Sequence, residues 1–222
     1  MGKLIHRLGE EKGHGIAVVI DDDDAGLSTV ELAEKLKGAD VAVDFTTAAA
    51  VRRNVGACVA AQIPLVEGTT GWNEQQTEIE KIVRHGDGAF VFGANFSIGV
   101  NLFYRIADFA STLIATFPEY EAFIEEQHHS RKKDAPSGTA LKLKEIVVAN
   151  IKRDFGVSAT RAGNIPGNHR VGFDGPADQI LLEHTARSRE GFAIGAILAA
   201  EWIVGKTGFY EFGDIINEIL KK

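Results

Sequence analysis

Apolar runs that alternate with helical patterns over the first hundred residues constrain the fold of this chain most strongly. The runs occupy residues 16–20, 41–45, 64–67 and 89–92. An apolar run without polar alternation is typical of a strand that is buried on both faces of a parallel sheet. One helix is predicted before the first run, at residues 4–8, and others between the runs, at 30–36, after Thr46 or Thr47, and at about 73–84. This order predicts βαβ units and an α/β, Rossmann-like parallel sheet.

The pattern changes after Asn95. A long helix is predicted over residues 100–116, then a strand at 121–126 and a helix after Ser137. Two extended segments, 169–174 and 179–187, flank Gly175-Pro176 and predict an antiparallel hairpin. Residues 192–204 and 214–220 are helical in pattern. We therefore expect a parallel-sheet domain, residues 1–97 and 190–222, interrupted by an α+β domain, residues 98–189.

Composition excludes several classes of protein. The chain has 24 Lys and Arg against 31 Asp and Glu, a net charge of −7 that argues against a general binder of nucleic acid or of anionic membranes. Its single cysteine, Cys58, allows no internal disulfide and no cysteine-based zinc site. The most apolar stretch, 192–200, is far shorter than the ~20 residues of a membrane span, and the N-terminus lacks a signal-peptide pattern. We expect a soluble, cytoplasmic protein.

A basic loop between a predicted strand and a predicted helix is the most informative segment. Residues 128–133 contain two histidines, one arginine and two lysines, and Ser137-Gly138-Thr139 follows. A solvated surface loop explains many such charge runs. Here, however, the loop leads to a helix N-terminus, whose free N–H groups favour an anion. The segment therefore predicts a site for a small carboxylate substrate, at which lysine or histidine could deliver a proton.

The adjacent pair His128-His129 could alternatively bind a metal. Neighbouring side chains on an extended segment point to opposite sides, and no third ligand is apparent from the sequence. We therefore expect no metal.

Short loops follow three of the predicted strands. They are Asp21–Asp24, Glu67–Gly71 and the loop from Gly93 to Ser97. In open α/β sheets ligands bind beyond the carboxyl ends of the strands, so these loops predict a shelf for a cofactor or substrate. An acidic residue after the second Rossmann strand typically binds an adenosine ribose and favours NAD. An ordinary surface turn explains the four aspartates equally well.

Taken together, these motifs resemble the dihydrodipicolinate reductase family. The run E-x-x-H-H-x-x-K-x-D-A-P-S-G-T-A is seen at residues 125–140. DFT at 44–46, GTTG at 68–71, ANFS-G-VN at 94–101 and HTARSREGFA at 184–193 also match, in the family's order. The resemblance covers nearly the whole chain.

The resemblance implies NAD(P)H-dependent reduction of 4-hydroxy-tetrahydrodipicolinate, a small cyclic dicarboxylate, in the diaminopimelate route to lysine. It implies a dinucleotide-binding first domain, and an inserted domain that binds substrate and joins a homotetramer. The residues that it places in the site form three groups: His128 and Lys132 as the proton-donating pair; His129, Gly138 and Thr139 as substrate contacts; and Asp21, Gly68, Thr69, Thr70, Gly93, Ala94, Asn95 and Phe96 at the cofactor.

Two departures from the family pattern are expected to matter. Asp22 and Thr47 stand where the family often has arginines, which favours NADH while leaving NADPH open. The family begins with a strand and a loop resembling G-x-x-G-x-M-G, and Met1-Gly2-Lys3 resembles the end of that loop. A truncated or misassigned start is the expectation. The alternatives are a non-catalytic homologue that acts in binding or assembly, and a Rossmann reductase of another small carboxylate.

Overall fold

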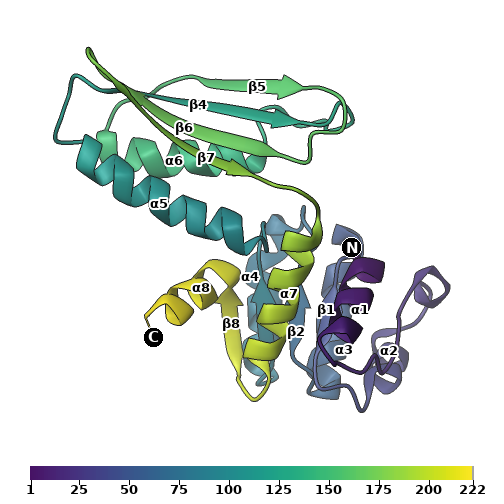
Figure 1. Ribbon diagram of the computed structural model, residues 1–222. Helices are drawn as coiled ribbons and strands as arrows, with labels where there is room; N and C mark the ends of the chain where they lie inside the picture. Colours follow the sequence, from purple (N-terminus) through teal and green to yellow (C-terminus); the bar gives the residue numbers. More distant parts are fainter. Residues whose placement is uncertain (222) are drawn as a thin grey trace. The chain divides into compact units, whose positions relative to one another are not determined.

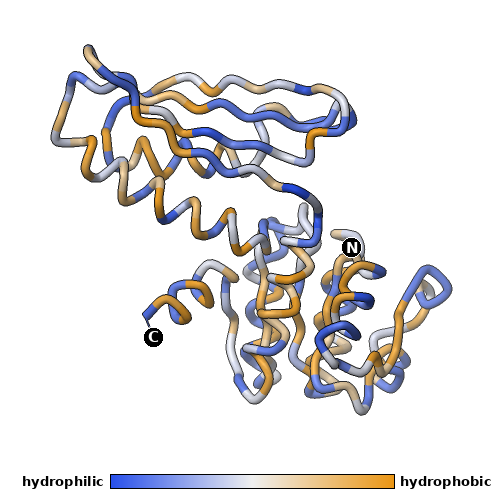
Figure 2. Tube along the Cα trace, viewed as in Figure 1, coloured by the Kyte–Doolittle hydropathy of each residue, from blue (hydrophilic) through white to orange (hydrophobic). Residues whose placement is uncertain are grey.

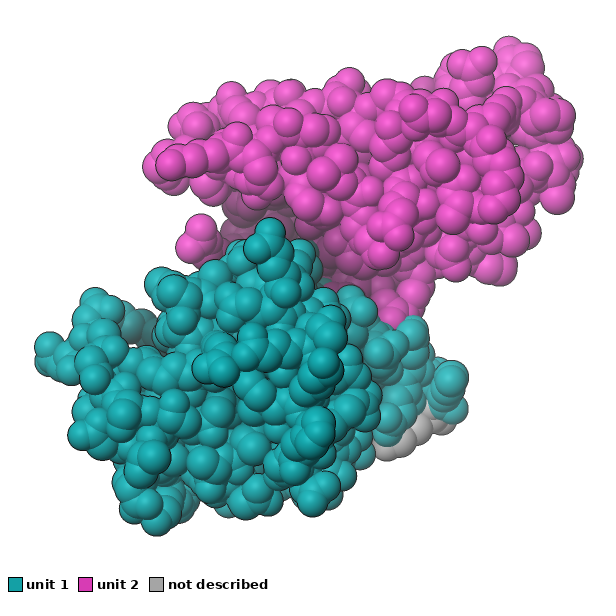
Figure 3. All heavy atoms as spheres, turned by 180° about the vertical axis from the view of Figure 1, so that it is seen from behind, with its two compact units in different colours: residues 1–97, 192–222 teal, residues 98–191 magenta. Residues whose placement is uncertain are grey.

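The computed structural model describes residues 1–221 and divides the chain into two compact units, which Figure 3 shows in teal and magenta. Unit 1 comprises Met1–Ser97 and Phe192–Lys222, and unit 2 comprises Ile98–Gly191. The return to unit 1 lies two residues after the expected position. The parallel sheet of unit 1 and the mixed sheet of unit 2 confirm the predicted α/β class with an inserted α+β unit.

Unit 1 contains a four-stranded parallel sheet in the order β1-β2-β3-β8. The strands are β1 (Ala42–Asp44), β2 (Leu65–Glu67), β3 (Ala89–Phe92) and β8 (Gly208–Glu211). Their register aligns Asp44 with Glu67, Glu67 with Phe92, and Phe92 with Glu211. Because all four strands run in one direction, their carboxyl ends form a single edge, from which the ligand-binding loops leave.

Helices surround this sheet (Figure 1). They are α1 (Gly2–Glu11), α2 (Thr29–Leu36), α3 (Ala48–Ala61), α4 (Gln76–His85), α7 (Glu190–Ile203) and α8 (Phe212–Leu220), with short 3-10 turns η1 (Asp22–Asp24) and η2 (Asn73–Gln75). Val51 and Ile79, from α3 and α4, are fully buried in the core with Phe90 of β3. Apolar residues run along most of α7 (Figure 2), and no helix in the described part of the chain is long and apolar enough to cross a membrane.

The prediction of a strand at residues 16–20 was wrong. The segment is irregular, and no strand of the described chain pairs with it. Val18 and Ile20 pack against the core of unit 1, whereas Val19 is 55% exposed. Apolar side chains can reach a core from irregular backbone, but a strand needs a partner for its N–H and C=O groups. Among the residues that the structure describes, β1 pairs with β2 alone, so the segment has no hydrogen-bonded partner strand.

Unit 2 is a mixed sheet in the order β5-β4-β6-β7, with α5 (Ile98–Ile114) and α6 (Gly138–Ile151) on one face (Figure 1). The strands are β4 (Glu121–His128), β5 (Val157–Arg161), β6 (Asn168–Asp174) and β7 (Gln179–Thr185). The predicted hairpin is confirmed as β6 and β7. Ile124, Leu143 and Phe173 are buried in the core between helices and sheet.

Two strands, β5 and β8, were not predicted. The sequence of β5, VSATR, is largely polar, and its residues are half-buried or exposed at the edge of the sheet. The four residues of β8 lie between two helices in the sequence, and aromatic packing against β3 holds them in the sheet. The ring of Phe209 stacks on Phe90, with centroids 5.1 Å apart. Neither strand carries the long apolar run that marks β1 to β3.

Candidate functional site

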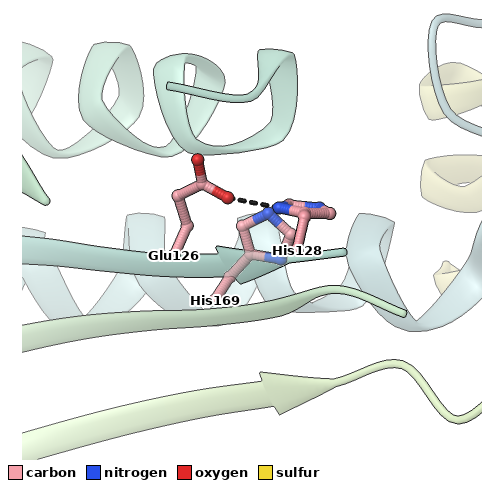
Figure 4. Close-up of side chains that lie close together, drawn as sticks. All are labelled: Glu126, His128 and His169. Atoms are coloured by element: carbon pink, nitrogen blue, oxygen red, sulfur yellow. Dashed lines mark hydrogen bonds and ion pairs between the residues drawn. The ribbon is translucent and has the colours of Figure 1, made fainter. Parts of the chain in front are cut away.

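Three buried polar side chains lie together where β4 meets β6 in unit 2 (Figure 4). Glu126 and His128 are two residues apart on β4, so they share one face of the sheet. The register of β4 and β6 sets Glu126 opposite His169. Sequence reasoning identified His128 but missed Glu126 and His169. The two-residue spacing could have indicated Glu126, whereas only the strand pairing brings in His169.

Glu126 is a buried carboxylate with a full set of donors. Its Oε2 is hydrogen-bonded to Nδ1 of His128. Its Oε1 accepts hydrogen bonds from Nη2 of Arg161 at 2.7 Å and from the backbone N–H of Ser137 at 3.1 Å. Burial would raise the pKa of Glu126, but the hydrogen bonds from Arg161, His128 and Ser137 hold it below its ordinary value. Glu126 is therefore ionised at neutral pH, and its charge is paired.

The two histidines of this cluster are held neutral. Burial lowers the pKa of His128, and the hydrogen bond that His128 donates to Glu126 opposes this only in part. The pKa of His169 is lowered to about 4, first by burial and then by the repulsion that a protonated His128 would exert. The rings make an edge-to-face contact with centroids 5.1 Å apart, and Nε2 of His169 shares a hydrogen bond of 3.2 Å with Ser137 Oγ. A neutral imidazole can accept a hydrogen bond at the nitrogen that its neighbours leave free.

The cluster also contains two residues of types that can bind a metal, Glu126 and His169, which the sequence had not placed beside His128. One ligand atom from each of Glu126, His128 and His169 lies within 4.8 Å of the others. However, both oxygens of Glu126 already accept hydrogen bonds, and the guanidinium of Arg161 lies against one of them. Lys132 adds a second positive charge that acts on both histidines. The charge distribution therefore favours a hydrogen-bonded network over a cation site.

The basic loop leads from this cluster to α6. Lys132 forms an ion pair with Asp134 at 2.8 Å, and that hydrogen-bonded contact lowers the pKa of Asp134. His129 is half-buried, and its Nδ1 has no hydrogen-bond partner among the described residues. The loop thus places a charged lysine and a half-buried imidazole next to the His128 cluster.

Gly138 and Thr139 form the first turn of α6, as the sequence predicted. Ser137 is the N-cap, and its Oγ accepts a hydrogen bond from the N–H of Ala140 at 3.3 Å. Gly138 is exposed, and a Cβ there would meet no atom within 4 Å. The carboxylate of Asp134 already accepts a hydrogen bond from the backbone N–H of Gly138, so this helix N-terminus holds a negative charge at the favourable end of its dipole.

A second candidate site lies in unit 1, at the carboxyl ends of β1 and β2. It is an open pocket of about 230 Å³ lined by Met1, Phe45, Thr46, Thr47, Ala48, Gly68, Thr69 and Thr70. Three of these residues, Gly68, Thr69 and Thr70, were predicted to contact the cofactor. The remaining wall includes the start of α3, where Thr47 occupies the N-cap position without a side-chain cap hydrogen bond.

Glycine at position 68 is required by the close approach of an aromatic ring. A Cβ there would lie 2.1 Å from Cε1 of Phe45. Thr69 is buried, and its Oγ1 has no hydrogen-bond partner among the described residues. Its backbone N–H donates to Oε1 of Glu67 at 2.7 Å. The pocket therefore combines a close backbone approach with an unpaired hydroxyl, both useful for contact with a ligand.

Glu67 is an acid that sequence reasoning recognised only as part of a turn. It is fully buried, and its register partner is Asp44. The pKa of Glu67 is raised to about 8, first by burial and then by the negative charge of Asp44. Asp44 accepts hydrogen bonds from the N–H of Thr46 at 2.8 Å and from Nδ2 of Asn54 at 2.7 Å. Glu67 is therefore neutral at pH 7.

The other predicted cofactor residues do not line this pocket. In the loop after β3, Ala94 is exposed, whereas Phe96 is buried with its ring centroid 4.7 Å from that of Phe212. Phe96 thus contributes its side chain to the core. Asp21 caps η1 by accepting a hydrogen bond from the N–H of Asp23 at 3.1 Å, and it does not follow a strand.

Comparisons with known proteins agree for both halves of the chain. Residues 1–96 match the family model for the N-terminus of dihydrodipicolinate reductase, and residues 99–216 match that for its C-terminus. A 4-hydroxy-tetrahydrodipicolinate reductase from Christiangramia forsetii is 34% identical, over 100% of this chain and 95% of the relative. One from Methanocaldococcus jannaschii is 39% identical, over 94% of this chain and 85% of the relative.

A solved structure gives the same fold. It is the dipicolinate-bound dihydrodipicolinate reductase from Paenisporosarcina sp. TG-14, with a TM-score of 0.77 and 22% sequence identity. The match covers 96% of this chain and 94% of that one. At this identity the similarity concerns the fold.

Proposed function

Because this chain belongs to the dihydrodipicolinate reductase family, we propose that it catalyses the NAD(P)H-dependent reduction of 4-hydroxy-tetrahydrodipicolinate to tetrahydrodipicolinate. This reaction belongs to diaminopimelate and lysine biosynthesis. The observation that carries the proposal is the 34% identity to the Christiangramia reductase over the whole of this chain. Unit 1 would bind the dinucleotide, and unit 2 would bind the cyclic dicarboxylate.

The pocket of unit 1 fits a nicotinamide cofactor. It lies at the carboxyl ends of parallel strands, beside the start of α3, and Thr69 contributes an unpaired buried hydroxyl. Gly68, Thr69 and Thr70 would contact the cofactor, which supplies a hydride when bound. We extend the proposal to Asp21, Gly93, Ala94, Asn95 and Phe96 on the family resemblance; Phe96 would act through its backbone, because its side chain is buried.

NADH is the proposed cofactor, with NADPH as the alternative. The 2′-phosphate of NADPH would add negative charge near a loop that already contains four aspartates, Asp21–Asp24. The nearby guanidinium of Arg53 is occupied, since its Nη1 donates to the carbonyl of Ala25 at 2.6 Å and its Nη2 to Asn54 Oδ1 at 3.0 Å. These contacts support a preference for the cofactor without the phosphate.

The groups of unit 2 would supply the proton and the substrate contacts. Lys132 carries a positive charge beside the neutral His128, so this pair can stabilise and protonate the charge that develops during reduction. His129 would contact the substrate. The first turn of α6, Gly138 and Thr139, would bind a substrate carboxylate through its N–H groups, in the place of the Asp134 carboxylate that accepts from Gly138.

We also propose a homotetramer and a cytoplasmic location, both on the family resemblance. The sheets of unit 2 would form the contact between subunits. In support, Leu181 of β7 is a large apolar side chain that is 45% exposed, and it lies on the sheet face opposite to that of Phe173, which is buried in the core.

The decisive experiment is an assay of reduced-nicotinamide oxidation with the freshly made product of dihydrodipicolinate synthase. The proposed function predicts turnover that depends on this substrate, and a higher kcat/KM with NADH than with NADPH. A binding or assembly protein would bind dipicolinate in a calorimetric titration without any turnover. A reductase of another small carboxylate would show turnover only with a different acid. Either of these results would contradict the proposal.

A further inference from the structure

We propose that Glu126 is a positioning residue, which orients the ring of His128 and anchors the first turn of α6 through its two separate oxygens. This inference rests on the proposed function for its catalytic meaning. Its structural content, the orientation and the tautomer of His128, can be tested without any assay of activity.

The two oxygens of Glu126 serve different parts of the site. Oε2 bonds to the imidazole of His128, at the end of β4. Oε1 bonds to the N–H of Ser137, the residue that caps α6. The same carboxylate therefore links the ring of the proposed proton-transfer pair to the helix turn proposed to bind a substrate carboxylate. A shift of this side chain would move both.

Glu126 also determines which nitrogen of His128 carries the proton. An ionised carboxylate can only accept hydrogen bonds, so Nδ1 of His128 must be the donor. In the neutral ring this leaves the lone pair on Nε2, and any further proton binds or leaves there. Arg161 keeps Glu126 ionised by its hydrogen bond to Oε1, so the tautomer follows from the network as a whole.

The backbone of Gly167 comes close to Nε2 of His128, and glycine has no side chain to fill the space there. A Cβ at position 167 would be 3.0 Å from Nε2 and 3.2 Å from Cδ2. Gly167 has φ of +146°, which side chains rarely adopt. The ring is thus bound at Nδ1 by Glu126 and contacted at its edge by His169, while glycine leaves room at Nε2.

The charged and titratable groups around His128 come from each neighbouring element. Glu126 is on β4, Arg161 on β5, His169 on β6, and Lys132 in the loop before α6. Among these, only Glu126 favours a proton on His128, whereas Lys132 and Arg161 disfavour it. Loss of the carboxylate charge would therefore remove the one interaction that supports an imidazolium.

The test is the variant Glu126→Gln, for which the hydrogen bonds of the network predict a change in the tautomer of His128. Arg161 and Ser137 both donate to the Oε1 position, so the amide oxygen of glutamine must take that place. The amide NH₂ then faces Nδ1 of His128 and donates to it, which forces the ring proton onto Nε2. We expect the Nδ1–H tautomer in the unaltered protein and the Nε2–H tautomer in the variant. Ring ¹⁵N chemical shifts of histidine-labelled protein report both, with assignment from the His128→Gln spectrum.

Glu125→Gln is the matched control. Glu125 is the preceding residue, on the opposite face of β4, and its contact is with Arg170 at 3.8 Å. We expect Glu126→Gln to lower kcat roughly 10- to 100-fold, as the loss of a group that orients a histidine does, with little change in the KM for NADH. Glu125→Gln should change neither the tautomer nor kcat.

Three results would overturn the inference: an Nε2–H tautomer in the unaltered protein, an unchanged tautomer in Glu126→Gln, or a kcat in Glu126→Gln equal to that in Glu125→Gln. The first needs no variant, so the test stands even if Glu126→Gln does not fold. If the unaltered protein lacks reductase activity, the proposed function fails, while the tautomer results still decide whether Glu126 orients His128.

Discussion

Asp44 and Glu67 are register partners at the ends of neighbouring parallel strands, and both residues are buried, next in sequence to Phe45 and Gly68 of the pocket of unit 1. Such a pair avoids two adjacent buried negative charges when one member keeps its proton. Here it is Glu67, whose pKa is raised to about 8, first by burial and then by Asp44. The strand ends that lead into the proposed cofactor site thus contain a neutral acid at pH 7.

The first prediction is that Glu67 makes the folded state less stable as the pH rises. A glutamate has an ordinary pKa of 4.5, against about 8 for folded Glu67. Between these values the unfolded chain releases the proton and the folded chain keeps it. The contribution to stability is therefore complete below about pH 4.5 and is lost towards pH 8, at a rate of at most about 1.4 kcal/mol per pH unit.

Urea denaturation at several pH values between about 5 and 8 measures this loss. Glu67→Gln keeps the shape without a titrating proton, so its free energy of unfolding should fall less steeply across this range. Glu211→Gln is the matched control, because Glu211 ends β8 in the same row but is exposed. Equal slopes for the unaltered protein and Glu67→Gln would contradict the prediction.

The second prediction concerns the acid side and His169. Its pKa is about 4 in the folded protein, against an ordinary value of 6.5, mainly because of burial. Between these pH values the unfolded chain binds a proton at this histidine and the folded chain does not. The free energy of unfolding therefore falls as the pH drops from about 6.5 towards 4. His169→Gln should reduce this loss, with a remainder from His128, whose pKa is also lowered. Denaturation curves over this range test it, and the exposed His85→Gln should behave like the unaltered protein.

The third prediction concerns Gly68 and the shape of the cofactor pocket. In Gly68→Ala the new methyl group would lie 2.1 Å from the ring of Phe45, so the ring or the loop must move. We expect a loss of about 1–3 kcal/mol in the free energy of unfolding and at least a tenfold weaker affinity for NADH. Calorimetric titration with NADH and thermal unfolding measure the two effects. Gly26→Ala, where a Cβ meets nothing within 4 Å, is the control, and a Gly68→Ala protein with unaltered affinity refutes the prediction.

The fourth prediction is that Lys132 acts in the chemical step. Lys132→Ala removes the positive charge beside His128, so kcat should fall about 100-fold or more, while the KM for the cofactor rises far less. Steady-state rates with varied NADH separate the two parameters. Lys133→Ala removes a positive charge from the adjacent, exposed position and should leave kcat close to that of the unaltered protein. An unchanged kcat in Lys132→Ala would disprove the assignment.

Local sequence patterns were enough to predict the elements whose burial or capping is visible in neighbouring residues. The runs at 41–45, 64–67 and 89–92 predicted β1, β2 and β3 because strands buried on both faces need apolar side chains throughout. Ser137 predicted the start of α6 because a hydroxyl can cap the free N–H groups of the first turn. The basic loop and the helix turn that follows it were visible in the same way.

Pairing between distant segments decided the rest. Residues 16–20 are as apolar as β2, yet no strand of the described chain pairs with them. The polar segment β5 forms a strand because its backbone pairs with that of β4 in parallel. His169 entered the site because the register of β6 sets it opposite Glu126, and Phe96 left the ligand surface because it packs on Phe212. Hydrophobic periodicity records how deeply a residue is buried, whereas strand partners and side-chain neighbours depend on contacts between residues far apart in the sequence. The sequence therefore determined the family, most of the elements and the basic loop, and the tertiary structure decided which side chains act on one another.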